Sequence, residues 1–397
     1  MKKLALSFIV CVFVVFFAVS FACAGDNIVE VPNLKIIIDG KLSELKDVPI
    51  SVNQRTLLPL RELAEKLGIP NDDEHIIWNN KEKSVTITKD SLKIYLKQGS
   101  KTVYVNGDPI ELDVAPVGYI NSRTYIPFRF MAETLGKKVI WDGKTQSIFI
   151  CDAEEFDKVK EFMDKSNEAM KAVKNYSAGM NIKMDIVQDS TRVPMDINVN
   201  LESDSAAEKM YMIMNTEIMG QEMIIEYYYD NEFVYMSNPL TNEWVKQKIS
   251  EEYANGMFKQ NGMYDFLNNS FNDIFYSGLR VAETDGESLI VLEGNVYLDS
   301  LFEMISKNIL GTSQSDLQVT DCYIKMSFDQ NTYYINDLSM QMNCNILSES
   351  GEGKMSMDLT AKYDYNRDIV VEIPEEVINN AVEMNLTEDS VVEGDAK

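Results

Sequence analysis

The chain has few of the residues from which most catalytic and metal sites are built. It contains one histidine, His75, and five cysteines among 397 residues. The three cysteines beyond residue 24, Cys151, Cys322 and Cys344, follow no metal-binding spacing. No glycine-rich phosphate loop and no acid–base pair at motif spacing accompany them. The sequence therefore predicts a protein that is not an enzyme and holds no metal or cofactor. A hydrolase built from scattered carboxylates is the enzymatic alternative.

Positive charge is also scarce. Lysine and arginine together number 37 against 63 aspartates and glutamates, which gives a formal net charge of −26. A surface of this sign repels the phosphates of nucleic acids and anionic lipid headgroups. The acidic composition therefore argues against a nucleic-acid partner and is typical of a protein kept soluble in an ion-rich cell envelope.

The N-terminus carries the pattern of a secretory signal peptide. Lys2 and Lys3 precede an uncharged apolar stretch from Leu4 to Ala22, and Ala22-Cys23-Ala24 offers small residues for cleavage. We expect cleavage after Ala24 and a secreted or extracytoplasmic, envelope-associated protein. The apolar stretch is also long enough to span a bilayer, so an uncleaved N-terminal anchor is one alternative. Lipidation at Cys23 is another, although no leucine stands three residues before it.

A fourteen-residue pattern, R-T-x-x-P-x-R-x-x-A-E-x-L-G, occurs at residues 55–68 and again at 123–136. In each copy apolar residues recur at i, i+3, i+4 and i+7, which predicts a short helix with one buried stripe. Proline opens the helix, and Gly68 or Gly136 is expected to end it in a left-handed conformation. A strand with a central tryptophan, Trp78 or Trp141, follows each copy. The repeat predicts two strand–helix–hairpin units.

These residues resemble the copper amine oxidase N-terminal domain, or stalk domain, found in secreted bacterial proteins. The resemblance covers residues 28–152 and implies an accessory domain without catalytic residues. Tyr363-Asp364-Tyr365 resembles the tripeptide that copper amine oxidases convert to a quinone, but Lys362 stands where that family has asparagine. Such a copper site also resembles a three-histidine site, and imidazole suits copper, whereas this chain has only His75. We therefore reject the oxidase activity.

Four arginines, Arg55, Arg61, Arg123 and Arg129, recur at equivalent positions of the two copies. A guanidinium fork binds carboxylates and carbonyls in two-pronged fashion. The arginines could therefore tie each helix to a neighbouring strand, or they could recognise a carboxylate or a glycan.

After residue 152 the pattern changes to one amphipathic helix followed by strands. Apolar residues from Phe156 to Val173 have helical spacing, and later segments alternate apolar and polar residues with period two. Strict alternation predicts an antiparallel sheet with one face exposed to solvent. Helical stretches near 253–271 and 301–310 interrupt the strands. Alternating strands are expected at 180–186, 195–201, 210–214, 324–328, 338–344 and 355–359.

One opening helix, a long curved antiparallel sheet and inserted helices together resemble the LolA-like lipoprotein-carrier fold, in which a half-barrel wraps an apolar cavity. The whole chain is therefore expected to be α+β: a duplicated small antiparallel-sheet and helix stalk domain, then a larger curved half-barrel sheet with packed helices. The expected parts are a signal peptide at 1–24, the stalk domain at 28–152, the LolA-like domain at 155–384 and a disordered acidic tail at 385–397.

Methionine concentrates in the second domain, since all 22 methionines but Met1 and Met131 lie there. Methionine packs adaptably and fills variable shapes. We therefore predict an apolar cavity for lipid or another greasy ligand, with a cell-wall or envelope partner for the stalk. The alternatives are a methionine-tolerant core in a structural or adhesive envelope protein, and a copper(I) site of methionine sulfurs. The candidate ligand-binding residues are Met184, Met195, Met210, Met212, Met214, Met326, Met340, Met342, Met355 and Met357.

Two of the cysteines fall on neighbouring predicted strands. Pairing Phe328 with Tyr333 around the intervening turn places Cys322 opposite Ser339 and Cys344 opposite Leu317. Their sulfurs would then point to opposite faces unless a bulge intervenes. The pattern therefore predicts free, packed thiols.

Overall fold

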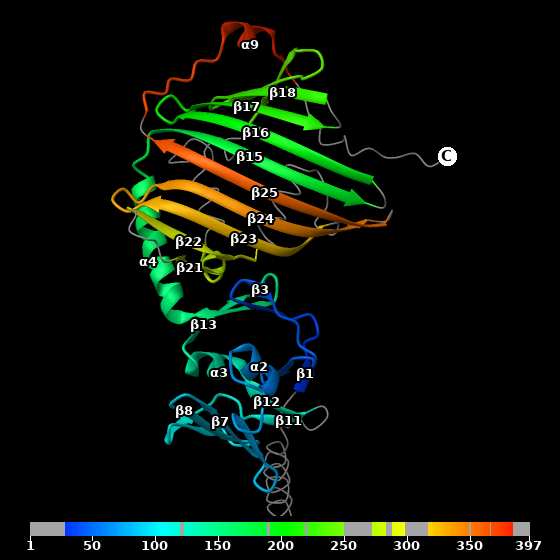
Figure 1. Cartoon of the computed structure of the whole chain (residues 1–397), viewed down its shortest axis with the longest axis vertical. Helices are drawn as coiled ribbons and strands as arrows, with labels where there is room; N and C mark the ends of the chain where they lie inside the picture. The colour runs from blue at the N-terminus through cyan, green and yellow to red at the C-terminus, as the bar shows by residue number, and fades with distance from the viewer. Residues whose placement is uncertain are drawn as a thin grey trace, which may run out of the picture. The chain divides into compact units, whose positions relative to one another are not determined.

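The computed structural model consists mainly of β-sheet (Figure 1). Two compact units are interleaved in the sequence, because the segment Ile36–Ser43 groups with the second. Unit 1 contains the chain up to Lys35 together with Glu44–Val139 and Gly143–Ser147, and unit 2 contains Ile36–Ser43, Ile140–Asp142 and the chain from Ile148 onward. The structure describes residues 28–119, 123–188, 191–218, 221–249, 272–282, 288–297, 317–348, 351–365 and 367–383.

The repeated pattern in unit 1 folds as a strand that leads directly into a short helix. Strand β5 (Arg55–Pro59) precedes α2 (Leu60–Lys66), and β12 (Arg123–Pro127) precedes α3 (Phe128–Thr134). The two strands pair antiparallel, so the copies meet through equivalent residues. Gly68 and Gly136 have φ angles of 82° and 72°, which confirms the expected left-handed helix ends.

Two five-stranded sheets build unit 1. The first has the order β1-β4-β5-β12-β11 and the second the order β10-β9-β8-β7-β6. The turn at Asn106-Gly107 has positive φ at both residues and joins β9 to β10. The remaining bounds are β1 (Ile28–Glu30), β4 (Ile50–Val52), β6 (Ile76–Asn79), β7 (Ser84–Lys89), β8 (Leu92–Lys97), β9 (Thr102–Val105), β10 (Asp108–Glu111) and β11 (Val117–Tyr119).

A four-stranded sheet of order β13-β14-β2-β3 combines the start and the end of the N-terminal region. Its hairpin turns at Asp39-Gly40, where both φ angles are positive. The strands are β2 (Lys35–Ile38), β3 (Lys41–Leu42), β13 (Lys137–Asp142) and β14 (Ser147–Asp152).

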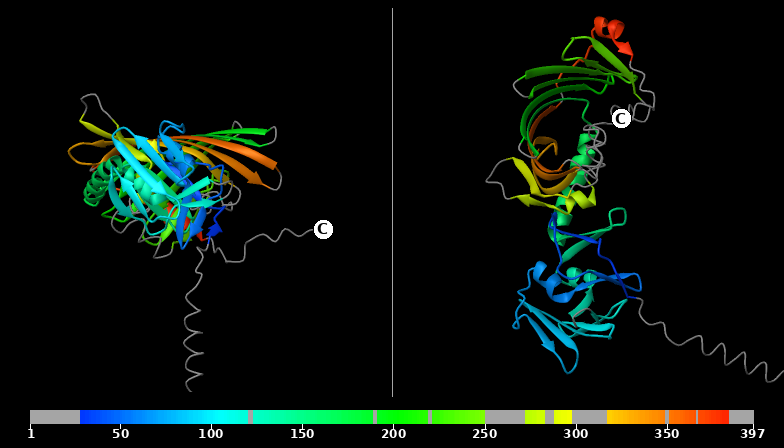
Figure 2. Two further views of the ribbon diagram at one scale, coloured as in Figure 1. Left: turned by 90° about the horizontal axis from the view of Figure 1, so that it is seen from below. Right: turned by 90° about the vertical axis from the view of Figure 1, so that its right-hand side faces the viewer.

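Unit 2 is dominated by one twelve-stranded sheet of order β21-β22-β23-β24-β25-β15-β16-β17-β18-β19-β20-β26. Its central strands are long and strongly curled (Figure 2). The strand pairs are antiparallel except β20 with β26, which are parallel. The bounds are β15 (Asn175–Gln188), β16 (Thr191–Asp204), β17 (Lys209–Ile218), β18 (Gln221–Tyr229), β19 (Phe233–Ser237), β20 (Trp244–Lys248), β21 (Leu279–Ala282), β22 (Leu289–Asn295), β23 (Leu317–Asp329), β24 (Ile335–Ser348), β25 (Gly351–Tyr365) and β26 (Val382–Glu383).

The opening helix of unit 2 is α4 (Ala153–Met170). The Asp152 carboxylate accepts hydrogen bonds from the amides of Glu154 and Glu155, which caps the helix start. Phe156, Val159 and Ser166 are buried on one face, as the spacing predicts. The other described helices of this unit are α7 (Asp273–Tyr276) and α9 (Glu375–Asn380). The helical stretches expected near 253–271 and 301–310, and the expected signal peptide and acidic tail, lie outside the described residues.

The expected strands are confirmed, but the register expected between β23 and β24 was wrong. Phe328 pairs with Ile335, not with Tyr333, because Tyr333 adopts a positive φ within the turn. A bulge between Val319 and Asp321 shifts the register again. Cys322 therefore lies opposite Met342, and Cys344 opposite Val319. Both thiols point to the same apolar face, where they are free and buried.

Candidate ligand-binding face

Strand register aligns sulfur-containing side chains across five neighbouring strands of unit 2. Cys322 on β23 lies opposite Met342 on β24, which lies opposite Met357 on β25. Met357 in turn lies opposite Met184 on β15, and Met184 opposite Met195 on β16. Residues directly opposite each other share one face of a sheet. These five side chains therefore form one continuous row, which we call the sulfur row.

Further apolar side chains extend this face on one side of the sulfur row. One neighbouring row runs through Ile324, Met340, Leu359, Ile182 and Ile197. A row further along contains Met326, Leu338, Ala361, Met180, Val199 and Met214. The alternating pattern of the sequence thus produces a broad apolar face, which we call the methionine face.

Burial across the methionine face is uneven. At the β22–β24 edge Leu292 and Met326 are fully buried, and Met342 is 3% exposed. On the middle strands Met184, Met357 and Met195 are only half-buried. The face therefore grades from a packed core at one edge to partly accessible apolar surface at its centre.

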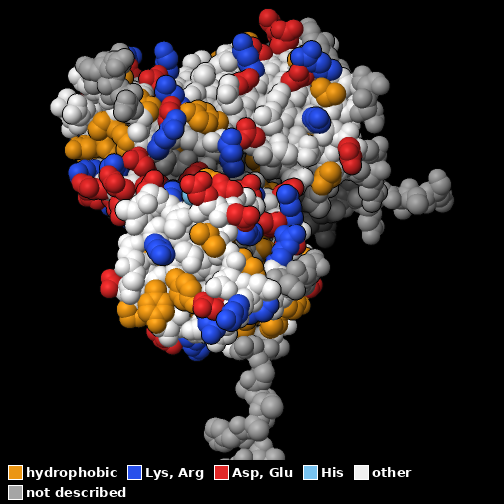
Figure 3. All heavy atoms as spheres, turned by 60° about the horizontal axis from the view of Figure 1, so that its bottom comes forward, with side chains coloured by type: hydrophobic (Ala, Val, Ile, Leu, Met, Phe, Trp, Pro, Cys, Tyr) orange, Lys and Arg blue, Asp and Glu red, His pale blue; other side chains and the backbone are white. Residues whose placement is uncertain are grey.

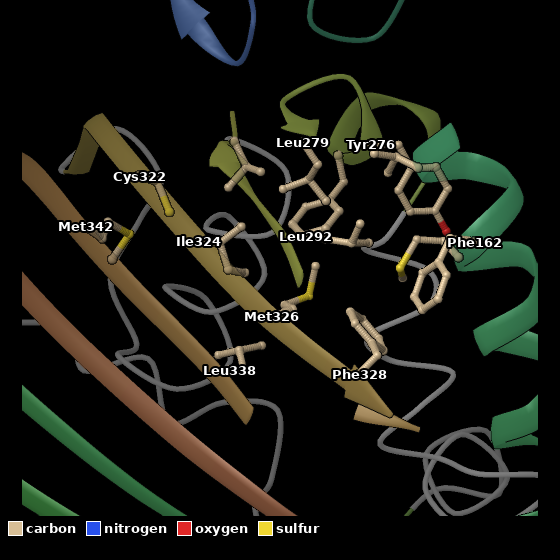
Figure 4. Packing of buried hydrophobic residues seen from close by; sticks show 14 of the residues in the cluster. Phe162, Tyr276, Leu279, Leu292, Cys322, Ile324, Met326, Phe328, Leu338 and Met342 are labelled. Atoms are coloured by element: carbon tan, nitrogen blue, oxygen red, sulfur yellow. The ribbon is translucent and has the colours of Figure 1, made fainter. Parts of the chain in front are cut away.

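Helix α4 accounts for the packed edge. Phe162 contacts the ring of Phe328 with centroids 5.0 Å apart. The labelled side chains of Ile324, Met326 and Phe328 point to the side on which Leu292 and Phe162 lie (Figure 4). The hydroxyl of Ser166 donates a hydrogen bond of 2.8 Å to the carbonyl of Tyr333. The helix therefore holds the β23–β24 turn in place through this hydrogen bond, and it covers the β22–β24 edge of the sheet.

The predicted methionines divide among three environments. Met326, Met342 and Met355 are buried in the large cluster beside α4, and Met184, Met340 and Met357 pack partly against it. Met210 is buried in a smaller cluster with Leu201, against which Met212 packs. Met195 and Met214 are half-buried on neighbouring strands. The structure therefore places all ten on the methionine face, in different degrees of packing. The ligand cavity itself stays a prediction.

Tyrosines at one end of the methionine face were not among the predicted site residues. Tyr363 and Tyr365 stack with parallel rings, and Tyr176 lies opposite Tyr365. Burial raises the pKa of all three hydroxyls. The hydroxyl of Tyr365 is buried without a hydrogen-bond partner in the described part of the chain. Their spacing within alternating strands would have placed them on this face, but the sequence drew attention to Tyr363 and Tyr365 only through the rejected oxidase tripeptide.

The opposite face of the central strands is polar. Asp185 binds Arg192 through both carboxylate oxygens, and the side chain of Asn181 donates to Asp196. A hollow of about 490 Å³ lies where β15 ends and β16 begins. Most residues that line it are charged, and Met184 and Met195 also line it. On the side of the whole molecule drawn in Figure 3, acidic and basic side chains intermix with each other and with apolar patches. The two faces of the curled sheet are therefore chemically distinct.

The repeated arginines make different contacts in unit 1. Arg61 donates to the Asn71 side chain and to the carbonyl of Ile76, which ties α2 to β6. Arg123 contacts the carboxylate of Asp47, whereas Arg129 reaches Glu133 on its own helix. Arg55 donates to Asp113 at 2.9 Å. Arg61 therefore makes the expected tie between a helix and a neighbouring strand, whereas the contact of Arg129 stays within its own helix.

The single histidine participates in a local turn. Asp72 accepts hydrogen bonds from the amides of Glu74 and His75, and its carboxylate lies 2.8 Å from His75 Nδ1. The hydrogen bonds from His75 lower the pKa of Asp72. Within the described ranges, no three histidine, cysteine or acidic side chains gather as a metal site would require. In the same ranges, no helix is both long and apolar enough to cross a membrane.

The geometry defines unit 2 as a curled antiparallel sheet with one apolar face and an opening helix, the element order expected from the LolA-like resemblance. Residues 158–382 match the family described as a family of unknown function, DUF6612. The chain therefore belongs to this family. Residues 37–150 match the copper amine oxidase N-terminal domain, which confirms the resemblance drawn from the repeated pattern.

Comparison with curated proteins gave no match. Among solved structures, LprF from Mycobacterium bovis is 11% identical with a TM-score of 0.30, and the match covers 55% of this chain and 97% of that one. An uncharacterised conserved protein from Thermus thermophilus is 9% identical with a TM-score of 0.26, covering 57% and 99%. A DUF1329 family protein from Desulfovibrio piger is 8% identical with a TM-score of 0.21, covering 53% and 95%.

Proposed function

We propose that the chain is a non-enzymatic, extracytoplasmic envelope protein whose methionine face binds an apolar ligand, such as the acyl chains of a lipid. The observation that carries this proposal is the row of half-buried methionines on β25, β15 and β16. Partly accessible apolar area on one face gains free energy when it is removed from water, about 25 cal/mol per Å². An acyl chain laid across the strands supplies that burial.

The residue type suits such a ligand. Methionine side chains have three rotatable bonds and a polarisable sulfur, so they adjust to chains of different length and unsaturation. Each methylene that the face buries contributes about 0.8 kcal/mol. In this proposal the copper amine oxidase N-terminal domain holds unit 2 near the membrane or cell wall, and the N-terminal signal directs the protein there.

A structural or adhesive envelope protein is the second candidate. The observation in its favour is the complete burial of Met326 and Leu292 beneath α4, which is the packing of an ordinary core. The two candidates differ in whether the central methionines of the face take up a ligand or pack only against protein.

Native mass spectrometry and organic extraction of the mature protein, purified from a membrane-containing host, test the proposal. We expect a stoichiometric lipid mass, and uptake of cis-parinaric acid by delipidated protein. If no bound lipid is found and the protein takes up no added fatty acid or phospholipid, the structural candidate alone remains.

A matched pair of variants locates the binding face. Met184 and Lys183 are adjacent on β15 and point to opposite faces of the sheet. Met184→Gln is expected to weaken fatty-acid binding about tenfold, the loss of about 1.4 kcal/mol, whereas Lys183→Gln leaves it unchanged. Equal effects of the two substitutions would place binding elsewhere.

A further inference from the structure

Unit 1 contains a cavity of about 500 Å³ beside helix α2. Every residue that lines it belongs to unit 1. Buried aliphatic side chains, among them Leu60, Ile76 and Val85, form part of its wall. The indole of Trp78 also lines the cavity and is 36% exposed. The cavity therefore combines an aliphatic wall with an accessible aromatic ring.

The remaining wall carries hydrogen-bonding groups whose positions are fixed. Nη1 of Arg61 donates to Asn71 and Nη2 to the carbonyl of Ile76, each at 3.1 Å. Arg123, from the second repeat, contacts Asp47, and its Nη1 lies 3.9 Å from Oε1 of Glu62. Guanidinium groups held in this way keep their other N–H donors in defined directions. The site therefore needs little reorganisation to bind a ligand.

One carboxylate oxygen of Glu62, in this wall, has no hydrogen bond within the described ranges. Its side chain is 12% exposed, and Oε2 accepts hydrogen bonds from the amides of Lys46 and Asp47. Oε1 is buried and has no hydrogen-bond partner in the described ranges. Such a buried acceptor still has the capacity to accept a hydrogen bond. A ligand hydroxyl that donates to Oε1 would satisfy it.

The charges that line the cavity nearly cancel. Lys46, Arg61 and Arg123 are positive, and Glu62 and Glu65 are negative. Two of the three cations also pair with carboxylates outside the wall, Arg61 with Asp73 and Arg123 with Asp47. A neutral molecule rich in hydroxyls uses both the donors and the acceptors of this wall without bringing in a further charge.

We infer that this cavity binds a neutral saccharide of one or two rings, which stacks its apolar C–H face on Trp78 and donates a hydroxyl to Glu62. A sugar ring presents C–H bonds on its faces and hydroxyls at its rim, which matches an aromatic platform beside fixed polar groups. The inference concerns unit 1 alone and does not rest on ligand binding by unit 2.

The second repeat supplies matched controls. Phe130 occupies the position equivalent to Glu62, and Trp141 the position equivalent to Trp78. Trp141 is 48% exposed and is not part of the cavity wall. Glu133, the equivalent of Glu65, is exposed and pairs with Arg129. Substitutions at Trp141 and Glu133 therefore change the same residue types outside the cavity.

Titration of the mature protein with two neutral disaccharides tests this inference. The disaccharides are cellobiose and the β-1,4-linked dimer of N-acetylglucosamine. Saturation-transfer NMR and tryptophan fluorescence report binding. We expect at least one disaccharide to bind, Trp78→Ala to weaken it more than tenfold and Glu62→Gln to weaken it several-fold. Trp141→Ala and Glu133→Gln should leave affinity unchanged, and thermal melts establish that each variant is folded.

Three outcomes would overturn the inference. The first is that neither disaccharide binds, and the second is that Trp78→Ala and Trp141→Ala have equal effects. The third is binding of succinate without either disaccharide, which would mark a carboxylate site. Met184→Gln, measured alongside, should bind the disaccharide like the unmodified protein, so failure of this site and failure of the lipid-binding face are distinguishable.

Discussion

The core of unit 1 and the centre of the large sheet in unit 2 bury their apolar side chains to different extents. In unit 1 Leu57, Leu58 and Ile126 have no exposed area. In unit 2 Met184 and Met357, at the centre of the large sheet, are only half-buried. Leucine and isoleucine have well-defined rotamers and specify one packing, whereas methionine specifies packing poorly. The difference indicates that the core of unit 1 has one defined packing, whereas the methionine face retains partly accessible apolar area.

The largest expected effect that separates the two units is on stability. Leu58→Ala leaves a cavity in a fully packed core and should lower the free energy of unfolding of unit 1 by about 3 kcal/mol. Met357→Ala removes a half-buried, adaptable side chain and should cost unit 2 less than about 1.5 kcal/mol. Urea titration with hydrogen exchange, read from peptides of each unit, measures both. Equal losses would mean that the methionine face is packed as tightly as unit 1.

Methionine oxidation should sharpen the same comparison. Met131 in unit 1 has no exposed area, whereas Met184 and Met357 are half-buried. Oxidation to sulfoxide requires access to the sulfur. Under limiting hydrogen peroxide, peptides containing Met184 or Met357 should oxidise about tenfold faster than the Met131 peptide, a difference of about 1.4 kcal/mol in barrier. Mass spectrometry of tryptic digests gives the rates, and bound fatty acid should slow only the first two.

The smallest expected effect lies at the packed edge of unit 2. Burial, with the nearby charge of Asp321, raises the pKa of Cys322 from 9.0 to about 12. Because the folded protein holds this proton more tightly than the unfolded chain, the stabilisation is complete below pH 9 and is lost as the pH rises toward 12. Between pH 7 and pH 10 the loss attributable to this thiol is about 1 kcal/mol.

The Cys322→Ala variant isolates this contribution. Its stability should fall less between pH 7 and pH 10 than that of the unmodified protein, as judged by urea unfolding at both values. Identical losses would show that the thiol ionises as readily in the folded protein as in the unfolded chain.

The sequence predicts where helices and strands lie more securely than which elements contact or pair with one another. Alternation located β15, β16 and β24, and the glycines at 68 and 136 located the ends of α2 and α3. The contact between Arg123 and Glu62 joins different repeats, and no local pattern reveals such a contact. The register of β23 and β24 was missed because Tyr333 enters the turn with positive φ and a bulge follows Val319. Both effects depend on backbone geometry that hydrophobic periodicity does not encode.

For the methionine candidates, too, one part of the arrangement could be predicted from the sequence and another part could not. Their common face follows from the period-two pattern, so the sequence predicted it. The order of strands, which sets Met357 beside Met184, depends on pairing between distant segments, and alternation gives no information on it.

The pairing of β15 with β25 has a consequence for how the protein forms. Tyr176 lies opposite Tyr365, so the first long strand of the sheet pairs with the last. During synthesis β15 emerges well before β25, and the row at Met184 stays incomplete until nearly the whole chain has left the ribosome. Contacts of such long sequence separation make folding slow and leave apolar edges open to aggregation. Under the proposed function, in which the chain is exported, the sheet therefore cannot be completed until nearly the whole chain has been translocated.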